Sequence, residues 1–198
     1  MNLPVLDFLR RVALPVLLLG MIAGCAAPRM ISPDADTAFQ RTGRFAVTVK
    51  TFSGAQDAVQ GGFAWQDTGS VLTLDLANPL GSTLARVTVR DGVAMLTHSN
   101  GAQEYAQDAD GLVEKVLGSP VPVSGLRDWL RGRTATDSAH QVQTDGTTGQ
   151  LAGFVQDGWR VRLSRYDALG PTVLQLNRRD AQRDISVRLA ISAQADSP

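Results

Sequence analysis

The chain has 198 residues and a mass of 21.1 kDa, and its residues are 43% hydrophobic and 19% charged. Nineteen Lys and Arg residues balance nineteen Asp and Glu residues, which argues against a nucleic-acid-binding protein, because such a protein carries a marked basic excess. The only cysteine excludes an internal disulfide framework and a structural zinc site built on cysteines. We therefore expect one binding or structural domain with no metal and no other cofactor.

The first 24 residues are typical of a lipoprotein signal peptide. Arg10 and Arg11 precede an apolar run over residues 12–22, which is shorter than the ~20 apolar residues of a membrane-spanning helix. The run ends in Ile22-Ala23-Gly24-Cys25, which resembles the lipobox of bacterial lipoproteins. There the cysteine thiol receives a diacylglyceryl group and becomes the mature N-terminus. An ordinary signal peptide that contains a cysteine is the alternative.

Lipidation of Cys25 predicts an anchored protein, because each buried CH₂ group adds about 0.8 kcal/mol of membrane affinity. In enterobacteria-like sorting, an Asp directly after the lipidated cysteine retains a lipoprotein in the inner membrane, but this chain has Ala26 there. We therefore expect an outer-membrane lipoprotein that faces the periplasm. Residues 25–38 lack hydrophobic periodicity and are expected to form a tether, which leaves residues 39–198 for the folded domain.

Period-two alternation of apolar and polar residues dominates this domain and predicts β-strands. Asp91-Gly92 joins two of the segments and is the strongest hairpin signal in the chain. The predicted strands cover residues 44–50, 60–66, 71–76, 84–90, 93–97, 103–105, 159–166, 173–176 and 185–189.

Two short helices interrupt the strands. Residues 112–117 place apolar side chains at helical spacing. Gly118 readily adopts the left-handed backbone conformation that ends many helices. Ser124 is expected to cap a second helix, which Gly132 ends. The predicted fold is mostly β with short helices: a curved antiparallel incomplete barrel, or half-barrel, covered by a helical lid.

Catalytic signatures are missing from the sequence. It has no G-x-S-x-G nucleophile elbow, no phosphate-binding glycine loop and no dinucleotide fingerprint. The acidic residues are scattered over turns and helix caps, so paired-carboxylate catalysis has little support. We therefore expect a protein that is not an enzyme.

The apolar face of the predicted sheet allows two interpretations. Its large side chains either form a filled core or line a cavity for an apolar ligand, and periodicity does not separate these possibilities. The candidate cavity residues are Phe45, Phe63, Trp65, Leu74, Leu76 and Trp129.

One turn carries an unexpected apolar residue. Pro79 fits the second position of a β-turn and Gly81 a later one, which places Leu80 near the tip. A leucine at a turn tip either folds back over the end of the sheet or projects outward.

An ordered series of motifs resembles the LolB family of outer-membrane lipoprotein receptors over nearly the whole mature chain. The series comprises the lipobox at Cys25, Gly43-Arg44-Phe45, Phe63-Ala64-Trp65-Gln66, Asn78-Pro79-Leu80-Gly81-Ser82-Thr83, residues 117–123, residues 126–132 and Gly158-Trp159-Arg160-Val161. The chain departs from the family pattern at residues 191–198, which lack the tryptophan expected in the last strand.

This resemblance implies both a fold and a function. The family fold is an open, strongly curved antiparallel half-barrel with a helical lid over an apolar cavity. A periplasmic carrier, LolA, hands an acylated lipoprotein client to the receptor, which seats the acyl chains in its cavity and inserts them into outer-membrane lipids without ATP. The resemblance also implies that Leu80, with Pro79 and Gly81, forms a projecting membrane-insertion loop.

Two other functions stay open at this point, and we expect a monomer in each case. One is a lipid-anchored half-barrel that binds a hydrophobic ligand or a protein partner without transferring it. The other is a structural lipoprotein with a filled core. The transfer function requires a hollow interior and an exposed Leu80, whereas the structural function requires neither.

Overall fold

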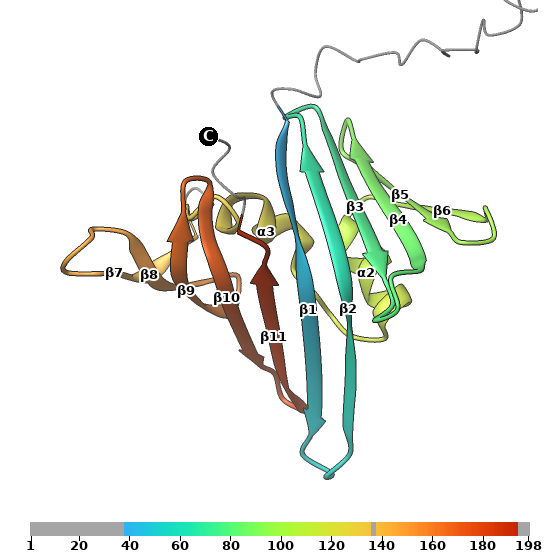
Figure 1. The fold of residues 1–198 in the computed structure, drawn as a ribbon. Helices are drawn as coiled ribbons and strands as arrows, with labels where there is room; N and C mark the ends of the chain where they lie inside the picture. Colours follow the sequence, from blue (N-terminus) through green and yellow to red (C-terminus); the bar gives the residue numbers. More distant parts are fainter. Residues whose placement is uncertain (1–37, 136–137, 194–198) are drawn as a thin grey trace, which may run out of the picture. The chain divides into compact units, whose positions relative to one another are not determined.

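The computed structural model describes residues 38–135 and 138–193, so the predicted signal peptide, Cys25 and nearly all of the predicted tether lie outside the described residues. Eleven antiparallel strands form one sheet (Figure 1), with the order β6-β5-β4-β3-β2-β1-β11-β10-β9-β8-β7. The strands are β1 (Phe39–Thr51), β2 (Gln56–Asp67), β3 (Val71–Ala77), β4 (Thr83–Arg90), β5 (Val93–His98), β6 (Gln103–Ala106), β7 (His140–Thr144), β8 (Leu151–Gln156), β9 (Trp159–Asp167), β10 (Gly170–Arg179) and β11 (Arg183–Ile191).

The strand order places the first and last strands together in the middle of the sheet. β1 pairs with β11 from Gly43 opposite Ile191 to Thr51 opposite Arg183. The two halves of the sheet then extend outward, as a meander from β1 to β6 and a second meander from β11 back to β7. The last strand of the chain, β11, is therefore a well-paired central strand, although the chain lacks the family tryptophan.

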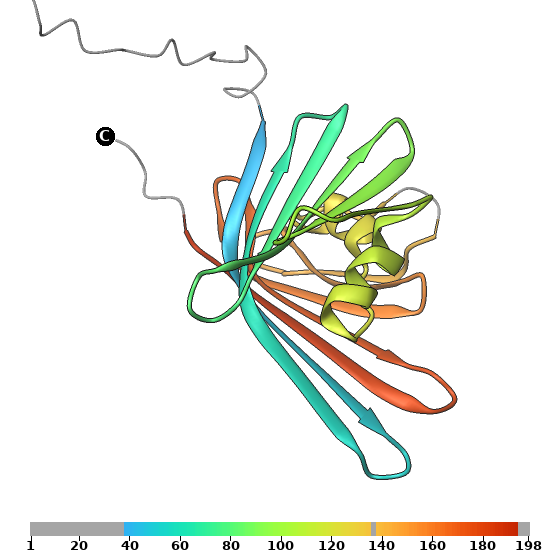
Figure 2. The same ribbon diagram turned by 90° about the vertical axis from the view of Figure 1, so that its right-hand side faces the viewer.

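Helices α2 (Ala109–Leu117) and α3 (Val123–Trp129) cover one face of the sheet, as Figure 2 shows. We call this the inner face and the opposite one the outer face. Along β3, Leu72, Leu74 and Leu76 are buried while the residues between them are half-buried. The hydrophobic core joins the inner face to both helices, and among the residues that the structure describes its buried members run from Phe45 to Ile191. A chain that begins after the signal peptide therefore retains all of these residues.

Two glycines allow the sheet to bend under its aromatic residues. In the register of β1 and β2, Gly43 lies opposite Phe63, and Phe45 lies opposite Gly61. A Cβ atom at Gly43 would lie 3.0 Å from the Phe63 ring and one at Gly61 would lie 3.0 Å from the Phe45 ring. Each phenylalanine thus covers a glycine of the neighbouring strand, an arrangement that stabilises curved sheets.

All of the predicted strands and both helices are present, and the mostly β, curved antiparallel fold is confirmed. Asp91 and Gly92 both have positive φ angles, 52° and 77°, as a tight hairpin turn requires. Gly118 ends α2 in the left-handed conformation, and the Asp108 carboxylate caps its first turn. β7 and β8 were not predicted.

The predicted capping role of Ser124 is wrong. α3 begins one residue earlier, at Val123, with Pro122 before it and no side-chain cap. Ser124 instead donates two hydrogen bonds to Asp110 of α2, from its backbone N–H at 2.8 Å and from its hydroxyl at 2.9 Å. A carboxylate from the neighbouring helix therefore satisfies the first turn of α3.

Candidate functional site: an apolar cavity under two helices

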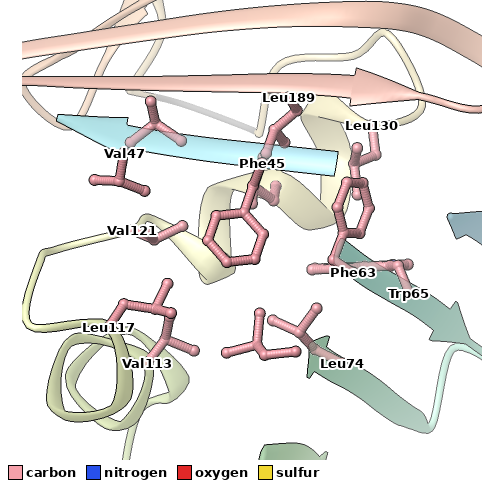
Figure 3. A pocket seen from close by; sticks show the side chains of 13 residues that line it. Phe45, Val47, Phe63, Trp65, Leu74, Val113, Leu117, Val121, Leu130 and Leu189 are labelled. Atoms are coloured by element: carbon pink, nitrogen blue, oxygen red, sulfur yellow. The ribbon is translucent and has the colours of Figure 1, made fainter. Parts of the chain in front are cut away.

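A small cavity lies between the inner face of β1–β3 and the two helices. Figure 3 shows the side chains that surround it. Its volume is about 30 Å³, and it is lined by Phe45, Val47, Phe63, Trp65, Leu74, Leu76, Val113, Leu117, Val121, Leu126, Leu130, Val187 and Leu189. Five of the six candidate cavity residues are in this lining. The alternation along three strands predicted them because inward residues of adjacent strands share one face.

The cavity has nearly the volume that one water molecule occupies in the liquid, about 30 Å³. An acyl chain of many CH₂ groups does not fit into this space. The structure is therefore a closed state with an almost filled interior, and occupancy by an acyl chain requires the helices to move away from the sheet. We call α2, α3 and the connecting residues 118–122 the lid.

Trp129, the sixth candidate, is fully buried but does not line the cavity. Its indole N–H donates a hydrogen bond to Gln156 Oε1 at 2.9 Å, and its ring contacts Phe154 edge to face at a centroid distance of 5.7 Å. These contacts hold the ring against β8. Helical spacing places Trp129 on the buried face of α3 but does not say which part of the core it meets, so a role of Trp129 at an acyl-chain site stays a prediction.

A buried carboxylate connects the lid to the sheet. Asp67, at the end of β2, has only 2% of its surface exposed. Arg127 of α3 donates to both of its carboxylate oxygens, at 2.8 and 2.9 Å, and Arg131 donates at 2.9 Å. We call Asp67, Arg127 and Arg131 the latch. It fixes the C-terminal end of the lid to the rim of the half-barrel.

Electrostatics show that the latch carboxylate is ionised. Burial alone would raise the pKa of Asp67, but hydrogen bonds from Arg127, the Gly69 N–H and Arg131 outweigh burial and lower this pKa from 3.8 to about 2. Arg131 also lies 4.1 Å from the centre of the Phe39 ring, a cation–π contact with the start of β1.

The two helices are also tied to each other. Asp110 of α2 accepts both hydrogen bonds from Ser124 of α3. Burial raises the pKa of Asp110, although the hydrogen bonds from Ser124 oppose this shift. Separating α2 from α3 would leave the half-buried Asp110 carboxylate without these donors, so the Asp110–Ser124 contact favours movement of the two helices as a pair.

Leu80 lies at the tip of the turn between β3 and β4. The Asn78 carboxamide oxygen accepts hydrogen bonds from the Leu80 and Ser82 N–H groups at 2.9 and 3.0 Å, and Gly81 adopts a φ of 90°. These contacts fix the turn, and Leu80 is 92% exposed. Of the two orientations that the turn pattern allowed, the structure shows the outward one.

Sequence reasoning missed the latch and the Asp110–Ser124 contact. Asp67 follows a strand and precedes Gly69, which is also the pattern of an ordinary turn. Its partners are 60 and 64 residues away. The available signal was the pair Arg127 and Arg131, four residues apart on one helix face, which is the spacing for binding a single carboxylate.

Among the residues that the structure describes, no helix is long and apolar enough to cross a membrane. The fold and site define a class of protein: a curved antiparallel half-barrel with a helical lid over an apolar interior and one exposed leucine on a fixed turn. Comparison with known proteins then gives the family.

The family model "Outer membrane lipoprotein LolB" matches residues 37–193. The outer-membrane lipoproteins LolB of Bordetella pertussis and Bordetella petrii are 51% and 55% identical to this chain over 177 residues, covering 89% and 88% of each chain. That of Cupriavidus taiwanensis is 40% identical, covering 90% of this chain and 92% of its own. This chain belongs to the LolB family and is an outer-membrane lipoprotein receptor in lipoprotein localisation.

Among solved structures, the LolA superfamily protein NE2245 from Nitrosomonas europaea aligns with 80% of this chain and 87% of its own. The TM-score is 0.42 and the sequence identity is 8%, so this likeness is too weak to carry an argument.

Proposed function

We propose that this receptor accepts acylated lipoproteins from a periplasmic carrier of the LolA type and delivers them to the outer membrane through Leu80. It is anchored at Cys25 on the periplasmic side of that membrane and catalyses no covalent reaction. The observation that supports this proposal is the combination of an apolar cavity under a separable lid with a leucine that is 92% exposed.

Acceptance requires the lid to open. The lid lines the cavity with the apolar side chains of Val113, Leu117, Val121 and Leu126, and the adjacent Leu130 completes this part of the lining. An acyl chain that replaces them on the inner face restores the buried apolar area, at roughly 25 cal/mol per Å². Opening must also separate the latch and two surface ion pairs, Lys115 with Glu104 at 2.8 Å and Glu114 with Arg183 at 3.7 Å. The buried latch is expected to cost the most, because exposed ion pairs contribute little.

Delivery requires contact with a bilayer. A leucine that moves from water into the acyl boundary of a membrane gains roughly 1.5–3 kcal/mol if its side chain becomes fully buried. The side chain of Leu80 is free to do so because the turn is held by hydrogen bonds from backbone N–H groups to Asn78 and not by contacts of the leucine side chain. A carboxylate at this tip loses the gain and must also be desolvated.

The test is Leu80→Glu in a two-step transfer assay. The chain is loaded with acylated client from its carrier, outer-membrane vesicles are added, and both steps are measured. We expect normal loading and a fall in delivery of about tenfold or more. Leu80→Ala should have a smaller effect, and Leu80→Phe should deliver close to the wild-type rate.

Val93→Glu is the matched control, because Val93 is also an exposed apolar residue beside a hairpin turn and is 51% exposed. It should load and deliver normally. If Leu80→Glu instead loads poorly but delivers all that it accepts, or melts well below the wild type, Leu80 is a structural residue and the proposed route of delivery is wrong.

A further inference from the structure

The outer face of four central strands carries a concentration of positive charge. Its outward residues on β1, β11, β10 and β9 include six cations and one carboxylate, although the whole chain has no net charge. The cations are Arg44, Lys50, Arg160, Arg162, Arg179 and Arg188, and the carboxylate is Asp184. We call this surface the basic face.

Most of these cations are available to a partner. Arg179 donates to both oxygens of Asp184 at 2.6 and 2.8 Å, which neutralises that pair. The other five form no ion pair with any residue that the structure describes. A folded protein gains nothing from cations placed together without partners, because like charges repel.

The strand register brings the cations close together. Arg162 and Arg188 both lie opposite Gln175 of β10, one on each side, so they are two strand spacings of about 4.8 Å apart. Arg44 lies opposite Ala190, two residues along from Arg188. The cations therefore form one surface across four neighbouring strands.

The basic face also contains a groove of about 670 Å³. Its lining includes four cations and one carboxylate together with hydroxyl and amide side chains: Lys50, Arg160, Arg178, Arg179, Asp184, Thr48, Asn177 and Ser186. Arg179 already pairs with Asp184, which leaves three cations for an anion. Cations surrounded by hydroxyl and amide groups suit a phosphodiester, which takes both ion pairs and hydrogen bonds.

The basic face adjoins the Leu80 turn. A second groove, of about 450 Å³, is lined by Arg44 of the basic face and by Asn78, Pro79 and Gly81 of the turn. Figure 2 shows this turn projecting from the side of the sheet opposite the helices. A plane that meets Leu80 therefore also approaches the outer face of the sheet.

We propose that the basic face binds the anionic headgroups of the bilayer into which Leu80 inserts. This inference rests on the proposed function, and it adds the lipid class that the receptor recognises. An apolar side chain in the acyl boundary with cations at the headgroups is the usual arrangement of an interfacial membrane site. The helices of the inner face and their flanks, residues 108–133, carry equal numbers of acidic and basic residues, so the excess of positive charge lies on the basic face and not on the lid.

The test measures binding of the unacylated chain from Ala26 onward, which retains every described core residue, to vesicles in low and high salt. The vesicles contain phosphatidylethanolamine alone or mixed with phosphatidylglycerol. Arg162→Gln/Arg188→Gln should weaken binding to the mixed vesicles about fivefold per cation, on the order of 25-fold in all. High salt should remove most of this difference. On phosphatidylethanolamine alone the variant should bind like the wild type.

Arg90→Gln/Arg133→Gln is the matched control, because it removes the same charge from two exposed residues outside the basic face and should bind mixed vesicles like the wild type. The inference is overturned if Arg162→Gln/Arg188→Gln equals this control while Leu80→Glu still impairs delivery. It is also overturned if the variant loses only acceptance from the carrier, since the basic face would then dock an acidic protein. Unimpaired delivery by Leu80→Glu would instead contradict the proposed function itself.

Discussion

Asp67 is an ionised carboxylate with almost no access to water. Three donors compensate for its desolvation: the guanidinium groups of Arg127 and Arg131 and the backbone N–H of Gly69. Removing one partner of a buried pair is costly because the remaining charge is left without compensation. The latch therefore stabilises the closed lid only while Asp67 is charged.

The latch predicts how stability depends on pH. The folded-state pKa of Asp67 is about 2 and lies below the ordinary value of 3.8, so the folded state binds fewer protons than the unfolded state in this range. Its contribution is complete above about pH 4 and is lost as pH falls through 2. We expect the free energy of unfolding to fall by about 2 kcal/mol from this group between pH 4 and pH 2.

The measurement is denaturant unfolding of the wild type and of Asp67→Asn at several pH values between 2 and 7. Other carboxylates with lowered pKa values, such as Asp167 beside Arg41, titrate in both proteins and cancel in the comparison. The variant should be less stable at pH 7, and the difference should shrink toward pH 2. A constant difference would show that Asp67 is not the titrating group.

Single residues differ in how far the sequence predicts them. Phe45, Phe63 and Leu74 could be assigned to one face because alternation along a strand is local information. Asp67 and Trp129 could not, because their roles depend on partners 60 and 27 residues away. The outward position of Leu80 came from family resemblance, since turn chemistry alone allows two orientations.

At the scale of elements, the close approach of β1, β2 and β3 depends on Gly61. A Cβ atom there would lie 2.1 Å from the backbone oxygen of Ala77 and 3.0 Å from the Phe45 ring. The backbone of β3 cannot move away without breaking its pairing with β2, which includes Gly62 opposite Ala77. A side chain at position 61 must therefore displace the strand or the aromatic ring that lines the cavity.

We expect Gly61→Ala to lower the free energy of unfolding by about 1–3 kcal/mol, the usual cost of overpacking. Thermal unfolding measures this effect. Gly54→Ala separates steric crowding from backbone strain, because Gly54 has a positive φ of 96° but no atoms within 4 Å of the added Cβ. A wild-type melting temperature for Gly61→Ala would show that the sheet does not require this close contact.

Elements were predictable where their apolar pattern was regular. β3 and β9 alternate strictly and were found with nearly correct bounds. β7 is exposed along its whole length, so no apolar alternation marks it. β8 buries the consecutive residues Gly153 and Phe154, which breaks the period of two. β8 pairs with the free edge of β9, and β7 pairs with β8. Such an edge is available only in the assembled sheet, so the local sequence does not reveal it.

At the scale of the whole molecule, the anchor should be independent of the fold. Cys25→Ala is expected to abolish labelling with a fatty acid and to release the protein from membranes. The released chain should keep its melting temperature, because the substitution leaves unchanged every core residue that the structure describes. Unchanged fatty-acid labelling of Cys25→Ala would contradict lipidation at this residue.

The pairing of β1 with β11 has a consequence for biogenesis. These strands contribute contacts between residues about 140 positions apart, and such non-local pairing folds slowly. In any order of appearance from the N-terminus to the C-terminus, as in the export that the predicted signal peptide implies, one edge of β1 stays unpaired until β11 appears. The sheet is therefore completed only at the end of that process, which suits the precursor that a signal peptide predicts.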